Sequence, residues 1–306
     1  MFRTIVVPLD GSRFAEAALP AATHLARRGR GRVHLIMAHQ PAGAPVRVGE
    51  MAISFNELDS ELKRREQSYV EDAAVRACEV GWGPIEFRLR EGPAGPTVCD
   101  EVGRMEADLV VMATHGRGAI GRFWFGSVAE YVVGHVSLPV LLVHPDHGEQ
   151  LAGAEGASGI LVALDLSEHS EAVLEPVTAM ARLLQSPVTL LHVLEPFYPP
   201  ESSAPDPVAQ DPTITDVRRA DAQKHLDRIA DRLRERCLSV STRVMIGDPA
   251  GATVLATLQD HSFGMVAMTT HGAGGLRHRL PGSVADRVIR AAEKPVLVVR
   301  PEGVLA

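Results

Sequence analysis

Two glycine-rich loops in the chain have the composition of an anion site. In each loop a glycine is followed, after nine residues, by a Gly-Ser pair: Gly116 with Gly126-Ser127, and Gly272 with Gly282-Ser283. Glycine lets a ligand approach the main chain closely. The Gly-Ser pair stands where a helix is expected to begin, and the unpaired N–H groups and the dipole of a helix start favour a phosphate. The pattern therefore predicts a phosphate site of backbone amides and one serine hydroxyl in each loop.

An aspartate follows the first apolar segment of each half of the chain, at Asp10 and at Asp165. In open α/β sheets, ligands bind at the carboxyl ends of the strands. Both the aspartates and the loops are expected at such ends, so they are candidates for one shared site. Basic side chains within the loops could add positive charge opposite phosphates, namely Arg117, Arg122, Arg277, His278 and Arg279.

The same residues also allow a purely structural interpretation. Ser127-Val-Ala-Glu130 has the form of a capping box, in which the serine caps the helix and the glutamate bonds back to it. Ser283-Val-Ala-Asp286 nearly repeats this pattern. Asp10 could likewise cap the helix that follows it. A capped helix needs no ligand, so both interpretations stay open for each residue alone, although their duplication on adjacent strand ends favours a nucleotide site.

These candidate residues belong to two copies of one sequence. The loops repeat at a constant offset (272 − 116 = 156 and 282 − 126 = 156), and the aspartates repeat at nearly the same one (165 − 10 = 155). Such a constant offset indicates a duplicated domain. Between the copies, residues 145–158 are rich in Gly, Ala, Asp and Glu without apolar periodicity, which is typical of a linker. We expect domain 1 at residues 1–147, a linker at 148–158 and domain 2 at 159–306.

The elements that must position these residues alternate along each copy. Continuous apolar segments predict strands and amphipathic segments predict helices. The alternation implies βαβ units, a parallel sheet with right-handed crossovers and an α/β fold class. In the first copy we expect strands at 4–9, 33–38, 85–89, 109–113 and 140–143, and helices at 12–28, 58–80, 96–105 and 128–135.

Composition narrows the function classes. The net charge of −7 argues against a general nucleic-acid binder. Three scattered cysteines without a CxxC pair are typical of a reducing cytosol, and no segment approaches the roughly 20 apolar residues of a membrane span. We therefore expect a cytoplasmic protein without nucleic-acid or membrane partners.

The chain lacks the motifs of a metal site or of a catalytic site. His115 and His271 follow the fourth strand of each copy, but no second histidine or cysteine stands at ligand spacing. There is no P-loop ending in Lys-Ser/Thr and no GxSxG motif. The residues thus predict neither a metal site nor a catalytic residue.

With its flanking strands, the loop resembles the fingerprint of the universal stress protein family in its tandem form: Gly, two residues, Gly, nine residues, Gly, then Ser or Thr. The last three elements stand in both copies, whereas Ala113 and Thr269 replace the first glycine. The resemblance implies two tandem Rossmann-like domains, each a five-stranded parallel sheet with helices on both faces. It also implies that a pseudo-twofold axis relates the domains, with the last strands, 140–143 and 296–299, at their interface.

The resemblance further implies ATP, with or without Mg²⁺, as the cofactor. In ATP-binding members adenine lies between the ends of strands one and two, the ribose meets the strand-one aspartate, and the phosphates lie along the Gly-Ser loop. Carried over to domain 1, the cofactor-binding residues are Pro8, Leu9, Asp10, Gln40, Met112, Ala113, His115, Gly116, Gly126, Ser127, Val128 and Ala129. In domain 2 they are Ala163, Leu164, Asp165, Val193, Met268, Thr269, His271, Gly272, Gly282, Ser283, Val284 and Ala285.

The departures from the fingerprint differ between the copies. Ala113 adds one methyl group, whereas Thr269 is β-branched and stiffer. Pro281 precedes Gly282 and removes one N–H donor. We therefore expect domain 1 to bind ATP at least as well as domain 2.

The function implied by the resemblance is that of a stress-response regulator or sensor. It would bind ATP in one or both domains and hydrolyse it weakly at most. A homodimer of tandem chains is compatible with this function. One alternative is a scaffold of the same fold that binds no nucleotide and acts through protein contacts, which the loss of the first glycine favours. Another is an adenylate-transferring enzyme, which the missing catalytic motifs disfavour.

Overall fold

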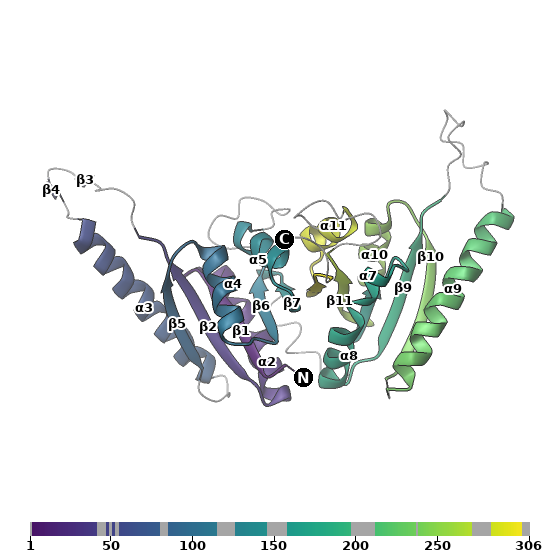
Figure 1. Ribbon diagram of the computed structural model, residues 1–306, viewed down its shortest axis with the longest axis horizontal. Helices are drawn as coiled ribbons and strands as arrows, with labels where there is room; N and C mark the ends of the chain where they lie inside the picture. Colours follow the sequence, from purple (N-terminus) through teal and green to yellow (C-terminus); the bar gives the residue numbers. More distant parts are fainter. Residues whose placement is uncertain are drawn as a thin grey trace. The chain divides into compact units, whose positions relative to one another are not determined.

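The computed structural model describes residues 2–41, 47–48, 51–52, 55–79, 85–114, 126–145, 158–196, 212–236, 238–270 and 283–301. The chain divides into two compact units, Met1–Gly153 and Ala154–Ala306. This division falls within the segment expected to be a linker. Each unit is an α/β domain with a parallel sheet, as the sequence predicted (Figure 1).

The sheet of unit 1 has the strand order β5-β2-β1-β6-β7. All neighbouring strands are parallel, so their carboxyl ends meet at one edge. The central strands are buried along nearly their whole length, as the continuous apolar segments predicted. The strands are β1 (Thr4–Leu9), β2 (Arg32–His39), β5 (Glu86–Glu91), β6 (Leu109–Ala113) and β7 (Val140–Val143).

Helices cover both faces of this sheet (Figure 1). One face carries α2 (Ala18–Gly29) and α3 (Phe55–Glu79), and the other carries α4 (Ala94–Arg104) and α5 (Ser127–His135). Right-handed crossovers produce this division, because the chain moves one way along the sheet through α2 and α3 and the other way through α4 and α5. A short antiparallel pair, β3 (Arg47–Val48) with β4 (Met51–Ala52), lies in the segment expected to be an irregular loop.

The helix expected at residues 12–28 is two helices, α1 (Arg13–Glu16) and α2, with Ala17 between them. Pro20 lacks the N–H that would bond to the carbonyl of Glu16, so the continuous ladder is interrupted here. Unit 2 repeats the break between α7 (Glu168–Glu171) and α8 (Leu174–Leu184), with Pro176 one residue after Glu175, the counterpart of Pro20 (20 + 155 = 175).

Unit 2 repeats the sheet in the order β10-β9-β8-β11-β12. Its strands are β8 (Gly159–Ala163), β9 (Val188–Leu194), β10 (Val240–Ile246), β11 (Phe263–Thr269) and β12 (Val296–Val299). Its longer helices after α8 are α9 (Pro212–Arg234), α10 (Ala250–Leu258) and α11 (Ser283–Ala291). None of the helices in the described part of the chain is long and apolar enough to cross a membrane.

Candidate functional site

The strand order reverses once in each sheet, and the candidate residues stand at that point. In unit 1 the chain moves from β1 to β2 on one side of β1, and β6 pairs on the other side. In unit 2 the equivalent neighbours are β8 and β11. A crevice at the carboxyl ends of two such strands is the usual ligand site of an open α/β sheet. Asp10 follows β1, and the loop that ends at Gly126 follows β6.

Asp10 forms the turn that links β1 to α1. Its Oδ1 accepts hydrogen bonds from the backbone N–H of Ser12 at 2.9 Å and from the Ser12 hydroxyl at 2.6 Å. Ser12 is the N-cap of α1, and its Oγ accepts from the N–H of Ala15 at 3.2 Å. The hypothesis that Asp10 itself caps the helix is therefore wrong. Asp10 stands one step earlier, where it fixes the orientation of the capping serine.

Unit 2 contains the same turn. Oδ1 of Asp165 accepts from the N–H of Ser167 at 3.0 Å and from its hydroxyl at 2.5 Å. Ser167 caps α7 by accepting from the N–H of Ser170 at 3.2 Å. Asp165 is exposed and Asp10 half-buried. Both units thus present an aspartate of the same local geometry at the end of their first strand.

The residue at the start of α5 supplies no side-chain cap. Gly126 occupies the N-cap position with extended backbone (φ −64°, ψ 139°), and as a glycine it makes no side-chain bond to the helix. The Gly126 N–H donates to the carbonyl of Thr114 at 2.8 Å, and the first intrahelical bond runs from the Glu130 N–H to the Gly126 carbonyl at 2.8 Å. Ser127 is the first helical residue and is exposed.

This geometry rejects the capping-box hypothesis for unit 1. A capping box needs the serine at the N-cap with its Oγ facing the N–H two or three residues later. Here glycine holds that position, and Ser127 lies one residue inside the helix. The amides of Ser127, Val128 and Ala129 precede the first intrahelical bond, so the helix itself supplies them with no acceptor. The Gly126 amide, by contrast, is already bonded to Thr114.

In unit 2 the described chain resumes at Ser283, the first residue of α11. The carboxylate of Asp286 accepts from Nε of Arg290 at 2.7 Å. The strand before the loop ends alike in both units, because the N–H of Thr270 donates to Val299 at 2.9 Å and that of Thr114 donates to Val143 at 3.0 Å. The two loops therefore leave the sheet from equivalent places.

The structure brings the remaining described candidates to the same edge of each sheet. The last two residues of β1 and of β6 are buried, as are their counterparts at the end of β11. Thr269 pairs with Val299 as Ala113 pairs with Val143, so the β-branched residue keeps the register of the strand. These residues are Pro8, Leu9, Met112, Ala113, Ala163, Leu164, Met268 and Thr269, with Val284 and Ala285 in the first turn of α11. Outside the described residues lie His115, Gly116, Arg117, Arg122, His271, Gly272, Arg277, His278, Arg279, Pro281 and Gly282.

The strand register corrects one predicted pair, Gln40 with Val193. The counterpart of Val193 is Ala38 (193 − 38 = 155), and that of Gln40 is Glu195 (195 − 40 = 155). The expected match was wrong by two residues, which is about 6.6 Å along a strand. Glu195 accepts from the N–H of Ala250 at 3.1 Å, at the start of α10. The offset of 155 in the sequence would have given Ala38 as the counterpart of Val193. The structure confirms this offset for the second strand, because Ile5 pairs with Val33 and Ile160 pairs with Val188.

Sequence reasoning also missed a charged cluster around a buried histidine at the end of β2. His39 is 1% exposed, with Nδ1 2.6 Å from Oε2 of Glu66 and Nε2 2.9 Å from Oδ1 of Asp59. Lys63 lies 3.1 Å from Asp59 and 3.1 Å from Glu91. Burial acts to lower the pKa of His39, but the hydrogen bonds to Asp59 and Glu66 outweigh it, so the pKa is raised. The cluster ties β2 and β5 to α3 and holds the second strand of the site in place.

No group of three or more His, Cys, Asp or Glu side chains that could hold a metal ion occurs within the described ranges. What the edge offers instead is a set of backbone amides at the start of α5 and an aspartate oriented by Ser12. Amides without an intrahelical acceptor fit an anion, which is the ligand chemistry that this helix start can offer.

The duplicated βαβ units, the reversal of strand order and the glycine N-cap define the class of protein, which is a pair of tandem Rossmann-like α/β domains. The chain belongs to the universal stress protein family, whose model matches residues 1–144 and again residues 158–300.

Relatives and solved structures agree with this assignment. A universal stress protein of Mycolicibacterium smegmatis is 25% identical over 303 residues, covering 97% of both chains. A single-domain universal stress protein of Thermus aquaticus is 32% identical over 143 residues, which is 47% of this chain and 99% of the relative. The crystal structure of a universal stress protein from Archaeoglobus fulgidus matches with a TM-score of 0.71 and 17% identity, covering 97% of this chain and 98% of the other. The tandem arrangement is thus found along the full length of relatives.

Proposed function

We propose that the protein is a stress-response regulator or sensor that binds ATP at the carboxyl ends of its strands. The observation that carries the proposal is the start of α5, where the N-cap is a glycine that supplies no side-chain cap and three successive amides lack an intrahelical acceptor. Such a helix start is stabilised by an anion through hydrogen bonds and the helix dipole. The same sequence pattern stands in both halves of the chain.

In this proposal each group at the edge has one role. The amides of Ser127, Val128 and Ala129 hold the phosphates, and the Ser127 hydroxyl, which is exposed, adds one donor. Asp10 accepts hydrogen bonds from the ribose hydroxyls, and its bonds from Ser12 keep it oriented. Ala38, rather than Gln40, is the residue of β2 that corresponds to Val193 and faces the base.

Binding rather than catalysis is the assigned activity. Hydrolysis of ATP needs a group within hydrogen-bond reach of the attacking water that can orient it or accept its proton. Among the acidic groups at this edge, Oδ1 of Asp10 is committed to Ser12. Asp59 and Glu66 are committed to His39. We therefore expect the bound nucleotide to turn over weakly at most.

The decisive experiment replaces the glycine N-cap of α5 with a residue whose side chain caps the helix in place of the proposed phosphate. Gly126→Asp places a carboxylate at the N-cap, where the extended backbone suits any residue and where aspartate is a favoured cap. The carboxylate stabilises the helix but repels phosphate, since like charges in contact cost several kcal/mol. Gly126→Ala is the matched control without cap or charge. The sequence counterparts in the second half are Gly282→Asp and Gly282→Ala.

Isothermal titration of the full chain with ATP measures the outcome. We expect Gly126→Asp to weaken binding to unit 1 by about 100-fold, while its melting temperature is unchanged or higher. The double variant Gly126→Asp/Gly282→Asp should bind no ATP. A wild-type chain that gives no heat with millimolar ATP would falsify the proposal.

One observation favours a second candidate, a scaffold that binds no nucleotide. Ala113 and Thr269 stand where the family fingerprint has glycine, and both are buried at the end of their strands. If the added carbon atoms close the path of the triphosphate, restoring glycine with Ala113→Gly and Thr269→Gly should create ATP binding that the wild type lacks. The single variants Gly282→Asp and Gly126→Asp, each of which leaves one site open, measure whether unit 1 binds ATP at least as well as unit 2.

A further inference from the structure

The other edge of the sheet in unit 1, at the amino ends of the strands, contains an arginine-lined cavity of about 510 Å³. Its side chains come from the starts of β1, β2 and β5 and from the ends of α2 and α4. Parallel strands bring them together, because Thr4 pairs with Arg32 and His34 pairs with Glu86. The basic side chains that line it are Arg3, Arg30, Arg32, His34, Arg88 and Arg104.

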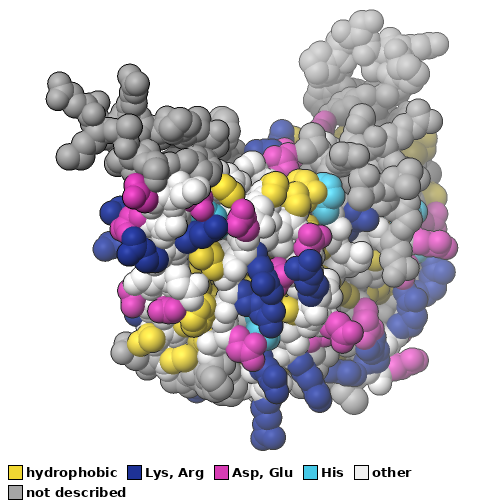
Figure 2. All heavy atoms as spheres, turned by 60° about the vertical axis from the view of Figure 1, so that its left-hand side comes forward, with side chains coloured by type: hydrophobic (Ala, Val, Ile, Leu, Met, Phe, Trp, Pro, Cys, Tyr) yellow, Lys and Arg dark blue, Asp and Glu magenta, His cyan; other side chains and the backbone are white. Residues whose placement is uncertain are grey.

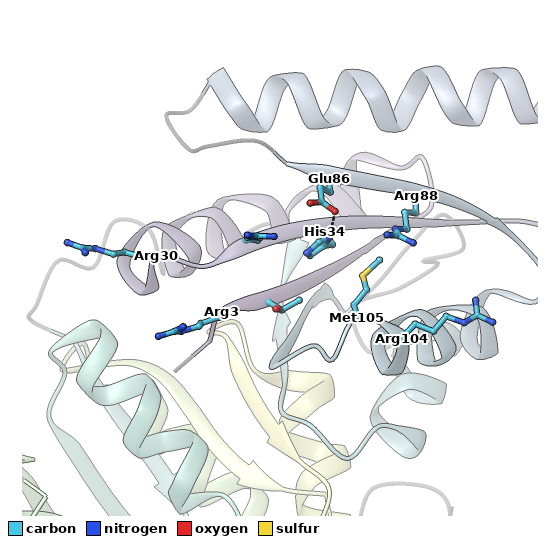
Figure 3. A pocket seen from close by; sticks show the side chains of 9 residues that line it. Arg3, Arg30, His34, Glu86, Arg88, Arg104 and Met105 are labelled. Atoms are coloured by element: carbon cyan, nitrogen blue, oxygen red, sulfur yellow. Dashed lines mark ion pairs between the residues drawn. The ribbon is translucent and has the colours of Figure 1, made fainter.

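The cavity has arginines at both ends. Arg3 and Arg30 lie at one end and Arg104 at the other, with His34, Glu86 and Arg88 between them (Figure 3). Seen as spheres, Lys and Arg side chains gather in the middle of one face of the molecule and continue to its lower edge (Figure 2). A ligand that spans this cavity would therefore meet guanidinium groups at each of its ends.

Positive charge exceeds negative charge around this cavity, although the whole chain has a net charge of −7. Five arginines and one carboxylate, Glu86, line it, and two further carboxylates contact its lining residues. Glu86 lies beside His34, Glu101 pairs with Arg104 at 2.6 Å, and Asp108 accepts from the backbone N–H of Arg3 at 2.8 Å. Within the described part of the chain, no carboxylate forms an ion pair with the side chains of Arg3, Arg30 and Arg32.

A buried ring nitrogen of His34 is an independent indication that the cavity binds a ligand. Its side chain is nine-tenths buried, and its Nδ1 has no hydrogen-bond partner among the described residues, with Glu86 Oε2 at 3.4 Å. A buried polar atom left without a partner is costly, and such exceptions call for an explanation. Burial is the main cause that lowers the pKa of His34; Glu86 opposes it, and Arg88 and Arg32 add to it. The arginines thus already make this region unfavourable for a further cation.

Unit 2 shows that the fold does not require these charges. The strands begin in the same register there, yet only one of the five arginines is kept, as Arg243, which lies over the Phe263 ring at 5.4 Å. The pair His34–Glu86 becomes the hydrogen bond between Thr189 and Ser241 at 2.9 Å. By the offsets of 155 and 156, the counterparts of Arg3, Arg30, Arg32 and Arg104 are Ser158, Gln185, Pro187 and Asp260.

We propose that this cavity of unit 1 binds a small molecule that carries two or more phosphate groups, at a site separate from the proposed ATP site. Guanidinium forks match the geometry of phosphate oxygens, and a terminal phosphate carries about two negative charges. Two phosphate groups on one ligand could each bind arginines at one end of the cavity. The volume lies within the range of small-molecule sites. An acceptor oxygen of the ligand would also give Nδ1 of His34 a partner.

Inorganic tripolyphosphate is the probe, titrated into the full chain at constant ionic strength. The test variant is Arg30→Gln/Arg32→Gln. Gln185 already occupies the counterpart of Arg30 in the same left-handed conformation (φ 56° against 51°), so the first change is compatible with the backbone. The matched control is Arg27→Gln/Arg219→Gln, which removes the same charge from exposed positions outside the cavity. Far-UV circular dichroism checks that each variant is folded.

We expect Arg30→Gln/Arg32→Gln to weaken tripolyphosphate binding by about tenfold or more, and the control to weaken it by less than about twofold. Tripolyphosphate would also meet the amides at the proposed ATP sites, so both variants are made in the Gly126→Asp/Gly282→Asp background, in which those sites are blocked and the cavity is intact. Equal losses in test and control variants would overturn the proposal, as would the absence of tripolyphosphate binding in the background itself. Citrate that binds as tightly as tripolyphosphate would overturn the assignment to phosphates.

The histidine ring locates the site directly. On titration with tripolyphosphate, the ring resonances of His34 should shift, while those of His192 in unit 2 should not. His192 is an internal control because it is also buried and already bonded to the carbonyl of Leu164 at 2.8 Å. Shifts confined to residues other than those of the cavity would contradict the proposed location, whatever happens with ATP.

Discussion

The two units have the same fold, and they differ most in the positions of their charged side chains. At the carboxyl ends of the strands, Asp10 and Asp165 form the same turn with the same pair of hydrogen bonds. At the amino ends, unit 1 has an arginine-lined cavity and unit 2 has mostly uncharged residues. Because unit 2 has the same strand order without these arginines, the fold does not require them. The comparison therefore separates what the scaffold requires from what each edge can bind.

A second difference lies between the second strand and the helix that covers it. In unit 1, His39 bonds to Glu66 and Asp59. The buried positions of α3 and α9 match at an offset of 156, so Ala222 corresponds to Glu66, and Leu194 corresponds to His39 at the offset of 155. Unit 1 thus has a charged contact between helix and strand where unit 2 has two buried apolar residues.

The largest expected effect comes from breaking that contact on one side only. His39→Leu leaves Glu66 and Asp59 without their buried partner, and we expect it to lower the free energy of unfolding of unit 1 by about 3 kcal/mol. The double variant His39→Leu/Glu66→Ala installs the residues of unit 2 and should recover most of that loss. Urea unfolding followed by circular dichroism measures both. A double variant no more stable than His39→Leu would show that the two contacts are not interchangeable.

A smaller effect should appear in the pH dependence of the same pair of proteins. The pKa of His39 is raised in the folded chain, so the folded state holds a proton that the unfolded state has released above about pH 6.5. The stability that this proton contributes is fully present below that pH and is lost as the pH rises through the folded pKa. Relative to His39→Leu/Glu66→Ala, the wild type should therefore lose stability as the pH is raised through this range. Parallel stability curves for the two proteins would contradict this account.

Much of the fold follows from the sequence because the buried strands are continuous apolar segments. The strands at 4–9, 109–113 and 140–143 have the predicted bounds. The helix expected at 12–28 was wrong because one proline interrupts its ladder, while the amphipathic pattern continues across the break. The short β3–β4 pair has no periodicity long enough to predict it.

The site was predictable in outline but not in its bonds. Asp10 and the Gly-Ser pair stand out in the sequence, yet Gly126, not Ser127, is at the N-cap, and Ser12, not Asp10, caps α1. One residue decides these roles, and helix boundaries are the least certain part of a sequence pattern. The contact of His39 with Glu66 and the arginine cavity depend on register between segments far apart in the sequence. Periodicity along one segment carries no information on such pairs.

The smallest expected effect compares the two aspartates. Asp10→Asn keeps an oxygen that can accept from the Ser12 N–H, so the turn should survive and the free energy of unfolding should change by less than about 0.5 kcal/mol. The charge and one acceptor for the ribose are lost, and we expect ATP affinity of unit 1 to fall by about fivefold. Asp165→Asn should have the same effect on unit 2 if its turn serves the same purpose. If Asp165→Asn instead leaves ATP binding unchanged while Asp10→Asn weakens it, then identical local geometry at the two strand ends does not amount to identical function, and the division between the units extends to the carboxyl edge as well.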